Sequence, residues 1–302
     1  MRICSLLPSA TEILYALGLG DSVVGVTHEC DFPADAATKP ALIRPRVDPH
    51  APAGEIDRQV SELVARGESI YAVDAELLRS LEPDLIVTQD LCHVCAASPD
   101  DLATALTRLA KKPRVLTLTP HSLGDVWNDI RKVGDATQRR REAQGIAITL
   151  EQKVAAIEAK VVQAKTRPRA LCLEWLDPFY VGGHWVPEMV AKAGGHDVLG
   201  RPGEPSFRVS GEQIAESGTE IIVVMPCGFN VKRIATEYGS TNFPDGFRNL
   251  PAVLAKGVFA VDANSYFSRP GSRLAEGVAV LAHLFHPDLF PAAPRGSSIQ
   301  RL

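Results

Sequence analysis

Short apolar runs recur along the chain and are separated by segments with helical spacing. The runs are nearly continuous rather than alternating, which is typical of parallel strands covered on both faces. Ser98-Pro99-Asp100-Asp101 offers a helix N-cap, a proline in the first turn and two acids behind it. Strands that alternate with helices predict an α/β fold with parallel sheets. We expect strands at Val23–Val26, Leu85–Thr88, Val115–Leu118, Ala170–Leu173, Ile221–Val224 and Val258–Val261.

The middle of the chain has a different pattern. Between about Ala136 and Lys165 there is no proline, and Leu150, Val154, Ile157 and Val161 form one apolar stripe on a helix. This helix is either an ordinary surface helix or a rigid connection between two α/β lobes, and its central position favours the connection. We expect an N-terminal α/β lobe at 1–135, a connecting helix at 136–166, a C-terminal α/β lobe at 167–290 and a flexible tail at 291–302.

An internal repeat supports two lobes. Residues 74–87 align without gaps with residues 210–223, and each segment predicts a capped short helix, a turn and a strand. Glu76 and Glu212 fall at the same place in the first turn of the two helices. A carboxylate at this place interacts favourably with the helix N-terminus, which by itself could explain both residues.

Composition and charge exclude several classes of protein. The 32 basic and 36 acidic residues give a net charge of -4, which argues against a nucleic-acid partner. The apolar runs are strand-sized, so we expect no membrane insertion. The first strand-like segment begins at Ile3, directly after Met1 and Arg2, and leaves no room for a signal peptide. This predicts a cytoplasmic protein. The alternative is a periplasmic or other extracytoplasmic protein whose leader has been trimmed. Phosphate-loop, dinucleotide and nucleophile-elbow motifs do not occur, so we expect no enzymatic activity.

The six cysteines divide by position. Cys4 and Cys172 lie inside predicted strands, where a thiol acts as a small apolar group. The others follow strand ends, where open parallel sheets bind ligands. One hypothesis is a soft site for a metal, an iron–sulfur centre or the metal of a corrinoid, and the alternative is incidental reduced thiols. The candidate metal ligands are Cys30, Cys92, Cys95 and Cys227, with His28 and His93 beside them.

Two further groups have ordinary explanations. Glu174 ends a predicted strand and could accept hydrogen bonds from a ligand or cap a loop. His184, His196 and His283 stand alone in the sequence, so we expect surface or core histidines.

Several motifs together carry a family resemblance. They are Ser5–Glu12, Val24–Pro33, Leu81–Val87, Ala193–Gly195, Val209–Gln213 and Ser268–Arg273. From Ile3 to about Pro287 the chain resembles the helical-backbone substrate-binding proteins of ABC importers, which bind cobalamin, haem and iron-siderophores. It is most similar to the cobalamin-binding branch. The resemblance implies two lobes joined by one helix, with a ligand in the cleft. It also implies that Glu76 and Glu212, one in each lobe, dock onto arginines of a membrane permease.

The chain departs from that branch at the ligand site. Glu29, Cys30 and Gln89 stand where the branch has aromatic residues. The resemblance nevertheless implies a non-catalytic protein that binds cobalamin or a related metal chelate in the cleft, and the positions of the cysteines predict that this cleft is cysteine-rich. The alternative is a cytoplasmic metal- or iron–sulfur-dependent redox or handling protein on the same scaffold. We expect the ligand to contact Pro8, Ser9, Glu29, Gln89, Glu174, Trp175, Phe179, Trp185, Phe207, Tyr266, Phe267 and Arg269.

Overall fold

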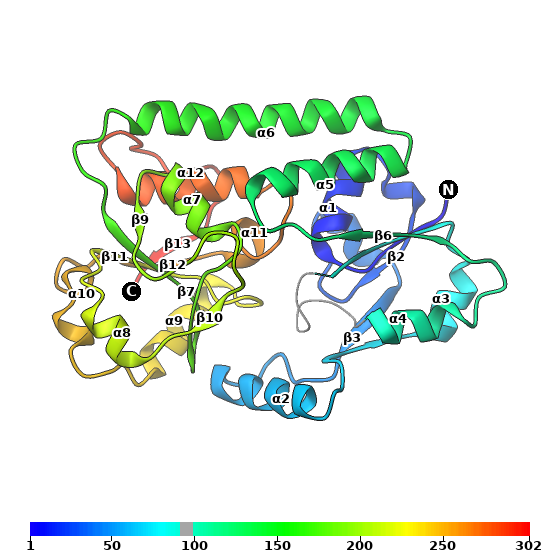
Figure 1. Ribbon diagram of the computed structural model, residues 1–302, viewed down its shortest axis with the longest axis horizontal. Helices are drawn as coiled ribbons and strands as arrows, with labels where there is room; N and C mark the ends of the chain where they lie inside the picture. Colours follow the sequence, from blue (N-terminus) through cyan, green and yellow to red (C-terminus); the bar gives the residue numbers. More distant parts are fainter. Residues whose placement is uncertain (91–98) are drawn as a thin grey trace. The chain divides into compact units, whose positions relative to one another are not determined.

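The computed structural model describes residues 1–90 and 99–302 (Figure 1). The chain divides into two compact units. The first unit comprises Met1–Ala51, Glu55–Pro120 and Gly124–Ile148, and the second comprises Pro52–Gly54, His121–Leu123 and Thr149–Leu302. Each unit combines a sheet rich in parallel strands with helices, which confirms the α/β fold class.

The first unit has a six-stranded sheet in the order β4-β3-β2-β1-β5-β6. All neighbouring strands are parallel except β3 and β4. Its strands are β1 (Ile3–Ser5), β2 (Val23–Thr27), β3 (Ala41–Pro45), β4 (Tyr71–Val73), β5 (Leu85–Gln89) and β6 (Arg114–Leu118). Its helices are α1 (Pro8–Ala16), α2 (Ala53–Ala65, which begins in the second unit), α3 (Ala75–Leu81), α4 (Pro99–Leu106) and α5 (Leu123–Ala136), with 3₁₀ turns at Gly20–Ser22 and Ala34–Thr38.

The core of the first unit lies between its sheet and helices α3 and α4. Cys4, Leu42 and Ile86 point from three strands toward Leu78 of α3 and Leu102 of α4. Helices α1 and α5 lie on the opposite side of the sheet (Figure 1). Cys4 is completely buried, and desolvation raises the pKa of its thiol to about 12. The prediction that this cysteine is a core residue is therefore confirmed.

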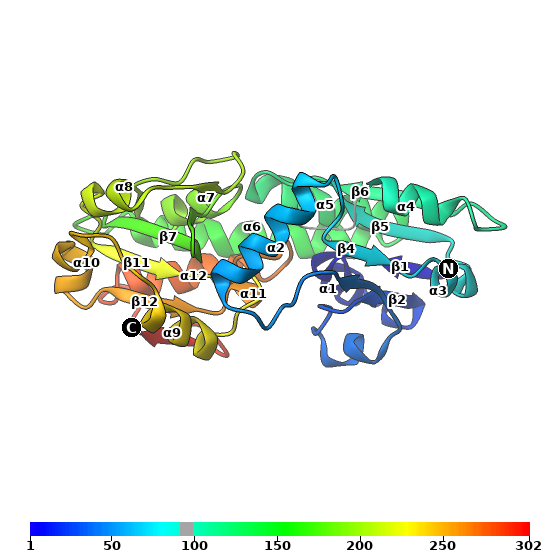
Figure 2. The ribbon, with the colours of Figure 1, turned by 90° about the horizontal axis from the view of Figure 1, so that it is seen from below.

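The second unit has a seven-stranded sheet in which β10-β8-β7-β11-β12-β13 lie in this order and β9 pairs with β7. Strands β7, β11 and β12 are parallel, and Cys172 lies fully buried within β7. The strands are β7 (Arg169–Leu176), β8 (Phe179–Val181), β9 (His196–Asp197), β10 (Phe207–Arg208), β11 (Ile221–Val224), β12 (Val258–Val261) and β13 (Ile299–Arg301). The helices are α7 (Val186–Lys192), α8 (Gly211–Glu216), α9 (Val231–Ser240), α10 (Pro251–Leu254), α11 (Ala263–Tyr266) and α12 (Leu274–Phe285), with a 3₁₀ turn at Phe247–Asn249 (Figure 2).

The internal repeat corresponds to equivalent elements of the two units. Asp74 caps α3 by accepting a hydrogen bond from the Leu77 backbone N–H at 2.9 Å. Ser210 caps α8 in the same way, with Gln213 bonding back to complete a capping box. Strands β5 and β11 follow these helices at matching places in the sequence. Across the described ranges, no helix is both long and apolar enough to cross a membrane.

The connecting helix is shorter than expected. Helix α5 ends at Ala136, and the next helix, α6, spans Arg140–Val161. Gln138 between them has a φ of 62°, a left-handed conformation that interrupts the helix. The 22 residues of α6 span about 33 Å, and the boundary between the two units falls within them, after Ile148.

The C-terminal segment differs from the expected flexible tail over 291–302. Its residues 299–301 form β13, which pairs antiparallel with β12 through Phe259↔Arg301 and Val261↔Ile299. Arg301 also lies over the Phe259 ring at 5.3 Å. The small residues and prolines of 291–297 suggested disorder, whereas this short strand is stabilised by pairing, which composition does not reveal.

Candidate functional site

Three neighbouring strands of the first unit have candidate side chains at or just after their carboxyl ends. Strands β2, β1 and β5 are parallel, so their carboxyl ends lie together; Glu29 and Pro8-Ser9 come shortly after β2 and β1, and Gln89 is the last residue of β5. Ser9 is 1% exposed and Gln89 7% exposed, so both are largely removed from solvent. Pro8 and Glu29 keep accessible surface.

Cys30 is buried among hydroxyl groups. Its thiol lies 3.1 Å from Thr11 Oγ1 and 3.3 Å from Thr27 Oγ1, and the residue is 3% exposed. A thiol in this environment packs as part of the interior and presents no surface to a ligand.

The proposed metal cluster does not assemble among the described residues. Cys92, His93 and Cys95 lie outside them. His28 directs Nδ1 to the Ile43 carbonyl at 3.1 Å, and Cys227 is exposed in the second unit. Within residues 1–90 and 99–302, no group of three or more histidine, cysteine or acidic side chains could hold a metal ion. An iron–sulfur centre therefore has no support in the described part of the chain.

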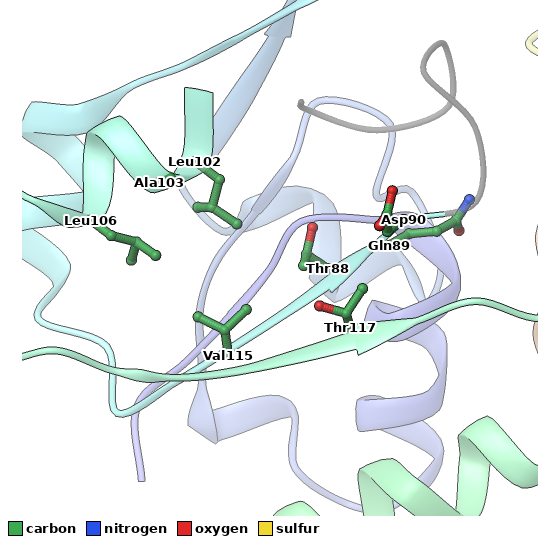
Figure 3. Close-up of a pocket in the computed structure, with 8 residues that line it drawn as sticks. All are labelled: Thr88, Gln89, Asp90, Leu102, Ala103, Leu106, Val115 and Thr117. Atoms are coloured by element: carbon green, nitrogen blue, oxygen red, sulfur yellow. The ribbon is translucent and has the colours of Figure 1, made fainter. Parts of the chain in front are cut away.

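A small cavity lies beside β5, β6 and α4. Thr88, Gln89 and Asp90 supply polar groups where β5 ends, and Thr117 faces them from β6 (Figure 3). The other end is apolar and is lined by Leu102, Ala103, Leu106 and Val115. This arrangement could receive an amide or hydroxyl group at one end and an aliphatic group at the other.

Trp175 belongs to an aromatic and cationic group in the second unit. It lies near the carboxyl end of β7, and its ring centroid is 5.1 Å from that of Phe229, which follows β11. The guanidinium carbon of Arg233 lies over the Phe229 ring, 3.6 Å from its centroid. Phe229 is 2% exposed, whereas Trp175 and Arg233 are only partly buried. A buried ring thus supports two side chains that remain accessible, one flat and one charged.

This group was only partly predicted from the sequence. Trp175 was expected to contact ligand, but Phe229 and Arg233 were missed. The available signal was Asn230, which caps α9 by accepting from the Arg233 backbone N–H at 2.9 Å. That cap fixes the helix start directly behind a parallel strand, where ligand-binding loops occur.

Phe179 belongs to a second set of rings. It stacks on Phe243 at 6.0 Å, and Phe243 in turn stacks on Phe247 at 3.9 Å. Tyr238 of α9 adds a tilted contact at 4.7 Å. Phe179 and Phe243 are partly exposed, so this set also offers a flat apolar surface.

Glu174 is bonded to the protein rather than open to a ligand. Ser206 Oγ donates a hydrogen bond to its carboxylate at 2.5 Å, and the Gly183 backbone also bonds it. Desolvation by burial has the largest effect on the pKa of Glu174 and raises it to about 7, although these two hydrogen bonds lower it. The residue thereby links β7 to the segment that leads into β10, which supports a loop-stabilising role.

The protonation of Glu174 predicts a pH-dependent stability. Between about pH 4.5 and 7 the folded chain keeps a proton that the unfolded chain releases. The free energy of unfolding should therefore fall as pH rises through this window, by about 3 kcal/mol at most. Urea denaturation at several pH values should show that Glu174→Gln removes most of this slope. Glu204→Gln, which alters an exposed carboxylate of the same segment, should keep it; equal slopes for wild type and Glu174→Gln would contradict the assignment.

Other predicted contacts are buried. Trp185 is 4% exposed and donates from Nε1 to the Phe267 carbonyl at 2.7 Å, and Phe267 is 1% exposed. Arg269 is 9% exposed. The expectation that Trp185 and Phe267 form flat ligand walls is corrected here, because neither ring presents a free face. Phe207, with Arg201 at 4.5 Å over its ring, and Tyr266 are partly buried.

Glu76 and Glu212 lie on the surface of their units. Glu76 is paired with Arg79 at 2.6 Å and with Arg108 at 3.8 Å, while its side chain stays 66% exposed. Glu212 is exposed in the first turn of α8. Exposed ion pairs contribute only about 0–1 kcal/mol, so Glu76 could exchange its own arginines for those of another protein at little cost.

Comparison with known proteins identifies relatives over nearly the whole chain. Residues 3–264 match the family described as periplasmic binding protein. An uncharacterised ABC transporter substrate-binding lipoprotein of Bacillus subtilis is 29% identical, with 96% of this chain and 81% of that protein aligned. The vitamin B12-binding protein of Vibrio parahaemolyticus is 22% identical over 94% of this chain and 89% of its own length.

A solved structure shows the same fold. The periplasmic haem-binding protein of Roseiflexus sp. RS-1, in its apo form, superimposes with a TM-score of 0.71 at 23% identity. The match covers 95% of this chain and 98% of that one.

These relatives overturn the expected cytoplasmic location. The matched family is that of periplasmic binding proteins, and the Bacillus subtilis relative is a lipoprotein. Both point to an extracytoplasmic protein. The cytoplasmic expectation was wrong because it rested on the residues that precede the first strand, which carry no information about the folded protein.

Proposed function

Because the chain belongs to the periplasmic binding protein family, we propose that it is the substrate-binding component of an ABC importer and that its ligand is a corrinoid or a related metal chelate. The family consists of non-catalytic binding proteins. The relatives bind different ligands by name, since one is a vitamin B12-binding protein and one a haem-binding protein. A shared fold therefore leaves the choice of ligand to the site itself.

The accessible group around Trp175 is the observation that carries the ligand proposal. An indole near the end of β7 and a guanidinium held over Phe229 place a flat apolar surface beside a positively charged group, which also pairs with Glu237 at 3.8 Å. A macrocycle with polar substituents matches both, because its ring covers apolar surface and its amides or carboxylates bond to the arginine. The partly exposed Phe179 and Phe243 extend the apolar surface.

The alternative of a cytoplasmic redox or iron–sulfur protein has lost its support. It needed a cytoplasmic location, which the relatives overturn, and a cysteine cluster, which the described residues do not form. We therefore retain the importer function alone.

Spectral titration tests the proposed ligand. Purified protein is titrated with cyanocobalamin and, in a separate experiment, with haem. We expect the protein to shift the visible absorbance of cyanocobalamin, with saturation at one equivalent of ligand. Trp175→Ala should weaken this binding about 10–100-fold, because the indole supplies contact area that alanine cannot replace. Phe290→Ala is the control, since this ring lies after α12 under Lys160 and should leave affinity unchanged. Saturable binding of haem with no response to cyanocobalamin would contradict the corrinoid.

A further inference from the structure

Two histidines that are far apart in the sequence lie side by side in the second unit. His121 follows β6 in the short segment His121–Leu123, and His184 precedes α7. Their ring centroids are 5.8 Å apart and their planes meet at 61°. His184 stands alone in the sequence, whereas the fold places it beside His121.

The ring of His184 has an unsatisfied nitrogen. Its Nδ1 is buried and has no hydrogen-bond partner among the described residues. The backbone of the same residue is fixed, because its N–H donates to the Glu204 carbonyl at 2.6 Å and its carbonyl accepts from the Gly203 N–H at 2.9 Å. A buried nitrogen without a partner costs about 1–3 kcal/mol, so a ligand that supplies a partner would be favoured.

The surroundings favour a neutral imidazole at His184 and hold the segment that carries His121 in place. Burial and the neighbouring His121 both lower the pKa of His184, and the neutral ring is the form that binds metals. Glu188 stands one helical turn beyond His184, and its carboxylate accepts from the Leu123 backbone N–H at 2.9 Å. This contact fixes the segment that carries His121. Lys192, 3.9 Å from the same carboxylate, offsets part of its charge.

We propose that His121 and His184 bind one divalent transition-metal ion of the zinc, nickel and copper class. Two imidazoles that share an ion at metal–nitrogen distances of ~2.0–2.1 Å have ring centroids about 5–6 Å apart, as here. Imidazole nitrogens suit these metals, and water completes the coordination. The ion would fasten the segment 121–123 to the start of α7. This site shares no residue with the proposed ligand surface at Trp175.

Calorimetry with nickel(II) tests the site. Alkylating the accessible thiols first removes competing sulfur ligands. Wild-type protein at about pH 7.5 should bind one nickel ion, and binding should weaken as the pH is lowered, because a protonated imidazole is not a metal ligand. His121→Gln and His184→Asn should each weaken binding at least tenfold, about 1.4 kcal/mol. Asparagine suits position 184 because its φ is 50° and asparagine tolerates this conformation.

Controls separate metal binding from loss of structure. His50→Ala removes an exposed histidine of the first unit and should bind nickel as wild type does. Circular dichroism verifies that each variant is folded. If a variant unfolds, nuclear magnetic resonance of the wild-type protein provides the test instead. Nickel should then broaden the imidazole signals of His121 and His184 before those of the other histidines. No saturable binding by the wild type, full binding by both variants, or earlier broadening of other histidines would overturn the proposal.

Discussion

Phe229→Ala is expected to lower the free energy of unfolding by about 3–5 kcal/mol. The ring is 2% exposed and contacts both the indole of Trp175 and the guanidinium of Arg233. Its removal leaves a cavity and also takes away the support of two accessible side chains. Chemical denaturation should therefore show a large loss of stability, and the variant should bind the proposed ligand more weakly at temperatures where it remains folded.

Phe32→Ala is the matched control for this prediction. Phe32 is 47% exposed in the first unit, so the same change of residue should alter stability by no more than about 0.5 kcal/mol. Equal effects of the two substitutions would show that Phe229 does not have the supporting role assigned to it.

The double charge reversal Glu76→Lys with Glu212→Lys is expected to reduce uptake of the ligand by more than tenfold while leaving ligand affinity unchanged. Both side chains are exposed and stand at equivalent places in the first turns of α3 and α8. If they dock onto arginines of a permease, two lysines would replace attraction with repulsion at both contacts. Uptake of labelled ligand by cells, together with titration of the purified variant, separates transport from binding.

Glu216→Lys provides the control on the same helix. It reverses an exposed charge at the end of α8 and should leave uptake near the wild-type rate. An equal loss of uptake with this variant would indicate a general charge effect, and normal uptake by the double variant would remove these two residues from the docking surface.

The sequence predicted the buried strands well because their signal is local. The expected strand Ile221–Val224 is β11 itself, and Leu85–Thr88 is β5 less one residue. Short strands with polar or isolated positions were missed, among them β4 and β10, because they depend on pairing with a neighbour. The length of α6 was overestimated because an apolar stripe does not show where a left-handed residue such as Gln138 interrupts the chain.

The candidate site was less predictable because it depends on contacts between distant residues. Trp175 could be selected from its place near a strand end, but its support by Phe229 is a packing relation. Trp185 and Phe267 looked equally suitable as aromatic residues, yet a hydrogen bond between them lies in the interior. The pairing of His121 with His184 joins two segments with no shared motif. Residue type indicates the available chemistry, whereas exposure and partners come from the fold.

The last strand bears on how this protein should be handled. β13 is short, and it covers the edge of β12 with backbone hydrogen bonds. Trimming residues 299–302 to shorten an apparently dispensable terminus would leave the N–H and C=O groups along that edge unpaired. Bare strand edges recruit strands from other molecules, so such a truncated chain would be prone to aggregate during expression or concentration.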